Sequence, residues 1–163
     1  MPPLDLATLT PQTGSIYPSP YQEMMQGRSS LRLAEAGGLT QYAVNLVRLE
    51  PGAMSSLRHW HHNEDEFVWV TMGECTLVQD GGAWVMRPGD CAAFPAGAPD
   101  GHHLVNHSDS PAAFLVVGTK APQETAVYSD VDMMVTVTAG DKAAAVVVHK
   151  DGTPWTGARP AVE

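Results

Sequence analysis

The most informative part of this sequence is the run Arg58-His59-Trp60-His61-His62-Asn63-Glu64-Asp65-Glu66. His59 and His61 are two residues apart, so on an extended strand both imidazole rings leave the same face. Two imidazoles on one face with a carboxylate nearby are typical of a transition-metal site. The run therefore predicts a metal-binding protein in which His59 and His61 supply nitrogen ligands.

Short apolar segments surround this run, and Gly, Pro and Asp residues separate them. The predicted strands are 30–36, 41–49, 66–72, 74–79, 84–87, 91–95, 102–106, 112–119, 133–138 and 143–149. Short strands at regular spacing with such turns predict an antiparallel sandwich or barrel. We therefore expect an all-β protein.

The two ends of the chain differ from this β-rich middle. Residues 1 to about 29 are rich in Pro, Gly, Ser and Gln, which predicts an irregular arm in which 20–26 could form one helical turn. We expect one domain over 1–163, with an N-terminal arm and first strand in 1–39, a barrel core in 40–119, and C-terminal strands and a tail in 120–163. The last two strands are expected to form a hairpin with a turn at Ala139-Gly140-Asp141.

The composition argues against several classes of function. The 163 residues carry a net charge of −9, and phosphate backbones need a basic patch, so no nucleic-acid partner is expected. No run is apolar and long enough to span a bilayer, and the start lacks the features of a secretory signal. We therefore expect a cytoplasmic protein with no membrane partner. Cys75 and Cys91 lack a CxxC spacing and are expected to be small buried hydrophobic residues.

A second segment completes a recognisable pattern with the first. The first segment resembles the first motif of the cupin superfamily, small jelly-roll β-barrel proteins, at Gly52, His59, His61, Glu66 and Gly73. The second resembles that family's other motif at Gly89, Pro95, Gly97, His102 and Asn106. One extra residue before His59 and a longer gap before His102 both fall in expected loops. The whole chain is also similar to one group of small stand-alone bacterial cupins.

The resemblance implies a double-stranded β-helix (jelly-roll) cupin barrel and a metal site formed by His59, His61, Glu66 and His102. Such mixed nitrogen and oxygen donors suit one divalent ion of Mn, Fe, Ni, Co or Zn, and affinity alone does not choose among these metals. Glu64 and Asp65 are alternatives for the carboxylate ligand. Strand alternation places Glu66 on the same face as Val68 and Val70, inside the barrel, which favours Glu66.

The resemblance also implies a metal-dependent enzyme that acts on a small carboxylate- or carbonyl-bearing molecule. Dioxygenases, decarboxylases, isomerases and lyases share this ligand set, and the fold does not select among them. No general acid or base stands out; Glu64, Asp100 and the loop around Gly101 are the candidates. The alternative is a non-catalytic small-molecule-binding or sensor protein with a structural metal.

An exposed strand edge and a proline-rich arm predict a homodimer in which residues 1 to about 40 contribute to the interface. Phe94 and Leu104 are expected to line the barrel interior beside Val68 and Val70.

Overall fold

β-Strands dominate the computed structural model of the protein, which describes residues 2–138 and 141–157. The strands are β1 (Gln12–Thr13), β2 (Arg28–Arg32), β3 (Tyr42–Leu49), β4 (His59–His61), β5 (Glu66–Met72), β6 (Cys75–Gln79), β7 (Gly82–Met86), β8 (Cys91–Phe94), β9 (His103–Val105), β10 (Ala112–Thr119), β11 (Gln123–Tyr128), β12 (Met134–Thr138) and β13 (Asp141–Val148). Helical structure is limited to the 3-10 turns η1 (Leu6–Thr8) and η2 (Tyr21–Met25) and the short α1 (Leu33–Ala36). In the part of the chain so described, no helix has the length and apolar character needed to cross a membrane.

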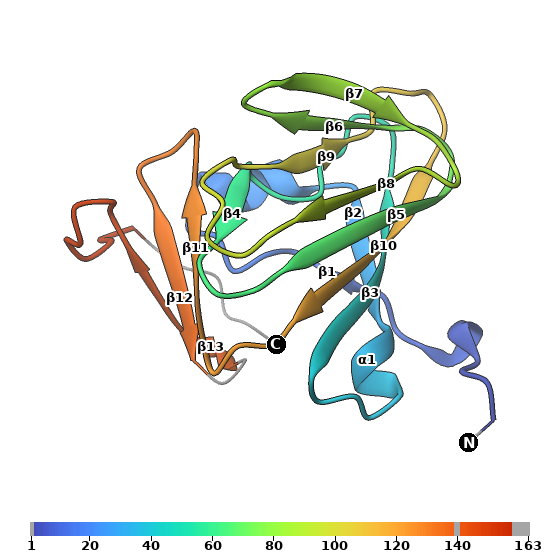
Figure 1. Ribbon diagram of the computed structural model, residues 1–163, viewed down its shortest axis with the longest axis horizontal. Helices are drawn as coiled ribbons and strands as arrows, with labels where there is room; N and C mark the ends of the chain where they lie inside the picture. Colours follow the sequence, from blue (N-terminus) through green and yellow to red (C-terminus); the bar gives the residue numbers. More distant parts are fainter. Residues whose placement is uncertain (1, 139–140, 158–163) are drawn as a thin grey trace.

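The strands form the jelly roll that the sequence predicts. The largest sheet has the order β1-β2-β3-β10-β5-β8, and its neighbouring strands are antiparallel. Two smaller sheets, β7-β6-β9 and β13-β12-β11-β4, make up the rest of the barrel (Figure 1). A β-bridge between His59 and His102 joins β4 to the start of β9, so these smaller sheets continue into one another.

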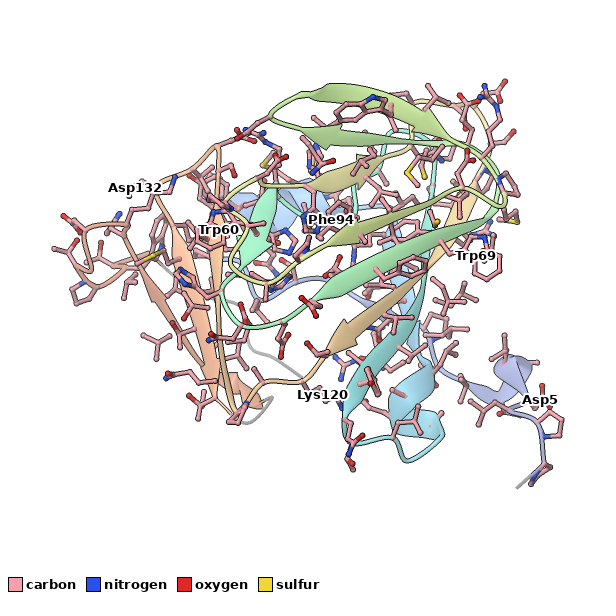
Figure 2. All side chains as sticks on the ribbon, in the orientation of Figure 1. Asp5, Trp60, Trp69, Phe94, Lys120 and Asp132 are labelled. Carbon is pink, nitrogen blue, oxygen red and sulfur yellow. The ribbon has the colours of Figure 1, made fainter. Side chains whose placement is uncertain are left out.

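The barrel core follows from strand alternation. On β5, Val68 and Val70 are fully buried, whereas Trp69 between them is 52% exposed. Phe94 and Leu104 are also buried in this core, as the sequence predicts. Figure 2 shows Phe94 near the middle of the molecule and Trp69 at its outer side.

A second core fixes the N-terminal arm to the C-terminal strands. Tyr17 and Met25 from the arm are buried with Tyr128, Met133 and Val135. The rings of Tyr17 and Tyr128 meet edge to face with their centroids 5.3 Å apart. The arm therefore packs on its own chain and covers one side of the barrel interior.

The structure corrects three expectations from the sequence. The predicted strand 30–36 is β2 up to Arg32, after which Leu33–Ala36 form α1. The predicted C-terminal hairpin is β12 and β13, but β11, which the sequence pattern did not reveal, joins it to β4. Cys75 is buried as expected, but Cys91 is exposed, because it pairs with Trp69 on the outer face of the large sheet. Residues 139 and 140 of the expected turn lie outside the described residues.

Candidate metal centre

Three strands bring the predicted ligands together. β4 is only three residues long, and His59 and His61 are its ends, so both rings point the same way, as alternation requires. Glu66 is the first residue of β5, and His102 directly precedes β9 and pairs with His59 across a β-bridge. The bridge places His102 beside the His59 and His61 pair although some forty residues separate them in the chain.

The donor atoms form a tight group. Nε2 of His59 lies 3.2 Å from Nε2 of His61, and the latter lies 3.3 Å from Oε2 of Glu66. Nε2 of His102 lies 3.3 Å from Oε1 of Glu66. Donors that each bind an ion at about 2.1 Å are about 3.0 to 3.4 Å apart for octahedral to tetrahedral angles. The observed spacings therefore fit a single small divalent ion. The donor atoms of His59, His61 and Glu66 all lie within 4.8 Å of one another, and His102 joins this group through its contact with Glu66.

The backbone sets the tautomer of His59. Its Nδ1 donates a 2.9 Å hydrogen bond to the carbonyl oxygen of Leu57 and lies 3.3 Å from Oγ of Ser56. Because the proton is on Nδ1, Nε2 presents its lone pair to the cluster. Such a contact behind a ligand fixes the orientation of the ring.

Glu124 on β11 lies behind the ring of His61, as Leu57 and Ser56 lie behind that of His59. The sequence did not predict this residue as part of the site. Its Oε1 lies 3.3 Å from Nδ1 of His61, although the angle is not that of a hydrogen bond. The two carboxylate oxygens accept 2.8 Å hydrogen bonds from the backbone N–H groups of His62 and Asn63. Glu124 is 8% exposed, and a buried acid held in this way orients the imidazole in front of it.

Phe94 fixes the ring of His102. The two rings are stacked with an interplanar angle of 3° and centroids 3.6 Å apart. His102 is fully buried, and its Nδ1 has no hydrogen-bond partner among the described residues. Packing against Phe94 on the ring face and the 3.3 Å hydrogen bond between Nε2 and Oε1 of Glu66 therefore hold this imidazole in place.

The electrostatics of the cluster favour a cation. Burial raises the pKa of Glu66, but hydrogen bonds from His102 and His61 outweigh burial and leave that pKa well below its usual range. Burial together with the nearby His61 lowers the pKa of His59 to about 3. Burial also lowers the pKa of His61, but Glu124 and Glu66 outweigh it and raise that pKa to about 10. A metal ion that binds His61 must displace this proton, so metal binding and proton release are coupled.

The other candidate acids, Glu64, Asp65 and Asp100, accept hydrogen bonds from backbone amides outside the cluster. Oε1 of Glu64 accepts a 2.8 Å hydrogen bond from the amide of Ala121, and Oδ1 of Asp65 accepts one of the same length from Ala96. Glu64 also forms, together with His61 and Glu124, a second group of side chains that could hold a metal ion. Asp100 accepts hydrogen bonds from the amide of Asp80 and the side chain of Gln79. None of these three acids lies in the wall of the cavity that contains His59, His61, Glu66 and His102.

That cavity has a volume of about 630 Å³, within the range of small-molecule sites. The cluster forms part of its wall, and the large sheet contributes residues from β2, β3 and β10. The arm from Thr10 to Tyr17 lines it as well, so the cavity is enclosed in part by the segment that the second core fixes in place. Many hydroxyl and amide side chains face it: Thr10, Gln12, Thr13, Ser15, Gln22, Ser30, Asn45, Ser55 and Ser56.

Comparison with known proteins identifies relatives with the same fold. Residues 45–118 match the model of the Cupin domain family. No curated protein matches the chain. A crystal structure from Silicibacter pomeroyi, described as a sugar phosphate isomerase of the cupin superfamily, is 58% identical, with a TM-score of 0.91 over 95% of this chain and 97% of that one.

Two further structures extend the comparison. One from Acidithiobacillus ferrooxidans, for which sugar phosphate isomerase activity has been suggested, is 27% identical, with a TM-score of 0.70 over 80% of this chain and 81% of that one. One from Thermotoga maritima, described as a predicted oxalate decarboxylase, is 21% identical, with a TM-score of 0.56 over 71% of this chain and 96% of that one, and shows the fold alone. The jelly-roll barrel, the two motifs and the relative from S. pomeroyi together show that this chain belongs to the cupin superfamily.

Proposed function

We propose that this cupin is a metal-dependent isomerase of sugar phosphates, with one divalent transition-metal ion per chain held by His59, His61, Glu66 and His102. The observation that carries the proposal is the place of the cluster: it forms one wall of a partly enclosed cavity with many hydroxyl and amide side chains. The near full-length relative described as a sugar phosphate isomerase supports the choice of reaction.

The reaction needs no second substrate. In the interconversion of an aldose and a ketose, one hydrogen moves between C2 and C1, and one proton moves between O2 and O1. A bound divalent ion would supply polarisation of the carbonyl group and acidification of the adjacent hydroxyl. The protein must then hold the sugar in place, exclude water and keep a proton available near O1 and O2.

Two buried phenols are suited to donate hydrogen bonds to O1 and O2 while that proton moves. Tyr17 and Tyr128 both line the cavity, and the ring of Tyr128 stacks on His59 with centroids 5.6 Å apart. Burial, with the neighbouring Tyr17, raises the pKa of Tyr128 well above its ordinary value, and burial likewise raises the pKa of Tyr17. Both phenols therefore stay neutral and can donate hydrogen bonds to substrate oxygens.

The cavity lining favours direct transfer of hydrogen between the two carbons. Among the described residues of the wall, Glu66 is the only carboxylate, and its oxygens contact His61 and His102 as a proposed ligand. Among the described wall residues, no carboxylate other than this proposed ligand is therefore available to remove a proton from C2. We infer that the hydrogen of C2 moves to C1 with its electron pair, while the hydroxyl proton of O2 passes to O1.

The test uses a panel of phosphorylated aldoses and ketoses with the Mn, Fe, Co, Ni and Zn forms of the protein. We expect interconversion, followed by NMR, that stops on chelation and in His59→Ala, while His62→Ala retains it because His62 is exposed and outside the cavity wall. A substrate with deuterium at C2 should give a product that keeps the label at C1. Loss of the label to water would contradict direct transfer and leave the isomerase proposal intact.

Two other outcomes would replace the proposal. Oxygen uptake or carbon dioxide release with small oxo-acids, without isomerisation, would indicate a dioxygenase or decarboxylase. Binding of sugars or acids with no turnover in any metal form would indicate a non-catalytic binding or sensor protein. The partly enclosed cavity suits this alternative as well, so turnover is the deciding measurement.

A further inference from the structure

An arginine in the wall of the cavity has no function in the site described so far. Arg28, Ser30 and Arg32 alternate along β2, so their side chains leave the same face of the strand, and all three line the cavity. In the register of the large sheet, Ser30 lies opposite Val47, a buried residue of the barrel core. β2 therefore presents two guanidinium groups to the same space as the histidine and glutamate cluster.

Arg28 differs from the other arginines that the structure describes, because it has no partner among the described residues. Its Nε is buried without a hydrogen bond, and the guanidinium makes no ion pair with any described residue. In contrast, Arg32, Arg48 and Arg87 contact the carboxylates of Glu35, Glu50 and Glu74, at 3.3, 2.9 and 2.7 Å respectively. Arg58 contacts both Asp80 and Asp130.

The unpaired guanidinium group of Arg28 is expected to lower the stability of the fold. Burial lowers the pKa of Arg28, and Tyr17 and Glu66 only partly oppose that effect. A buried charge without a partner is unfavourable for folding, so replacing it with an apolar side chain of similar size often stabilises a protein. An arginine in such a position gains its partner when an anion enters the cavity, and its planar fork matches phosphate or carboxylate oxygens in pairs.

We propose that Arg28 binds the phosphate group of the substrate, while the sugar end of the same molecule reaches the cluster of His59, His61, Glu66 and His102. The choice of phosphate rests on the proposed function; the presence of an anion site rests on the cavity and on Arg28 alone. Arg32, which is partly exposed and paired with Glu35, adds positive charge at the edge of this site.

The layout of the sheet separates the two ends of the ligand. β3 and β10 lie between β2, which carries Arg28, and β5, which carries Glu66. Three strand spacings separate β2 from β5 by about 14 Å across the sheet, and the register also offsets Arg28 from Glu66 along the strands, because Arg28 lies in register with Leu49 and Glu66 with Gly118. Both residues nevertheless line the same cavity, and the charge of Glu66 acts on the pKa of Arg28, so the two charged groups face a common space. The anion site and the cluster are therefore distinct, so a phosphate held at Arg28 leaves the cluster free for the carbonyl end.

The first experiment measures anion binding without metal, so that no metal ion competes for phosphate. Inorganic phosphate is titrated into chelator-treated protein by calorimetry for the wild type, Arg28→Met and Arg48→Met. We expect Arg28→Met to bind phosphate about tenfold more weakly or worse, because a charge-assisted hydrogen-bonded pair is lost. Arg48→Met should equal the wild type, because Arg48 is exposed on β3 and pairs with Glu50 outside the cavity. Parallel titrations with sulfate and succinate show whether the site prefers tetrahedral anions or carboxylates.

Thermal unfolding separates a binding role from a structural one. Without phosphate, Arg28→Met should unfold at the same temperature as the wild type or higher, since it loses an unpaired buried charge. Phosphate should raise the unfolding temperature of the wild type and leave that of Arg28→Met unchanged. If Arg28→Met does not fold, Arg28→Lys is compared instead; it keeps the charge, loses the paired hydrogen bonds and should bind phosphate more weakly than the wild type.

Several results would overturn this inference. These are equal phosphate affinity in the wild type and in the Arg28 variant that folds, or an equal loss in Arg48→Met. The proposed function can fail separately. If no sugar phosphate is isomerised but Arg28→Met still loses phosphate, the anion site stands without the isomerase. If isomerisation occurs and Arg28→Met leaves the KM for phosphorylated sugars unchanged, the anion site alone is wrong.

Discussion

Oε1 of Glu124 lies 3.3 Å from Nδ1 of His61, and the same carboxylate accepts hydrogen bonds from the two backbone amides that follow His61. A residue of β11 thus holds the end of β4 and one of its imidazoles in a single arrangement. The pairing of Ala126 with His61 across β11 and β4 sets this contact, because it places Glu124 next to the turn after His61.

Replacement of Glu124 should weaken the metal site without removing a proposed ligand. Glu124→Gln keeps the shape of the side chain but loses the charge behind His61. We expect metal affinity to fall about 10- to 100-fold, as for other carboxylates that orient a metal-binding imidazole. Competition with a chromophoric chelator measures the change. Glu23→Gln, at an exposed position of η2, is the matched control and should bind metal like the wild type. Equal affinity in both variants would remove Glu124 from the site.

The two histidines of β4 should be required for metal binding. The double variant His59→Ala and His61→Ala removes two of the four proposed donors, and we expect the metal content to fall from one ion per chain to a trace. Elemental analysis after gel filtration measures it. His62→Ala and His107→Ala change exposed histidines and should keep the full metal content. A double variant that retains its metal would disprove the ligand assignment.

The two cysteines should differ in reactivity. Cys75 is buried, and burial, with the nearby Glu74, raises the pKa of its thiol to about 11, so it stays protonated at neutral pH. Cys91 is exposed. Iodoacetamide at about pH 8 should therefore modify one thiol per folded chain, because only an accessible thiolate reacts. Mass spectrometry should locate the label at Cys91, and unfolding in urea should expose the second site. Labelling of Cys75 in the folded protein would contradict the position of β6.

A homodimer remains a prediction. The outer face of the large sheet carries Phe67 and Trp69, which are 37% and 52% exposed, and Leu115 lies opposite Trp69 in the register. We expect a second copy to cover such apolar positions, so Trp69→Lys should shift the protein toward monomer in sedimentation equilibrium. Trp84→Lys, at an equally open position on β7, is the control. A monomeric wild type at high concentration would disprove the dimer.

Deletion of the arm is a less direct test of the dimer than substitution on the sheet face. Tyr17 and Met25 of the arm are buried against the C-terminal strands of the same chain. Removal of residues 1–29 would therefore destabilise the fold as well as any interface, and a loss of dimer would have two explanations.

The parts of the fold that depend on neighbouring residues could be predicted from local sequence. Alternation along 66–72 places Glu66, Val68 and Val70 on one face, and β5 has these bounds and these buried residues. The same local rule puts His59 and His61 on one side of β4. Turn residues between the strands and the resemblance to the cupin motifs then predicted the jelly roll, because each of these signals lies within a short segment.

The surroundings of these residues depend on contacts between distant segments and could not be predicted in the same way. β11 begins with the polar residues Gln123, Glu124 and Thr125, so the sequence pattern does not indicate a strand there. Glu124 is buried where it accepts hydrogen bonds from backbone amides that lie about sixty residues earlier in the chain. Arg28 has the same appearance in the sequence as the paired arginines, and its isolation becomes visible only where β2 and the arm enclose the cavity. Burial and pairing depend on contacts between distant segments, so local sequence specifies the strands and their inward faces, whereas packing of the sheets and the arm determines which polar groups share the cavity.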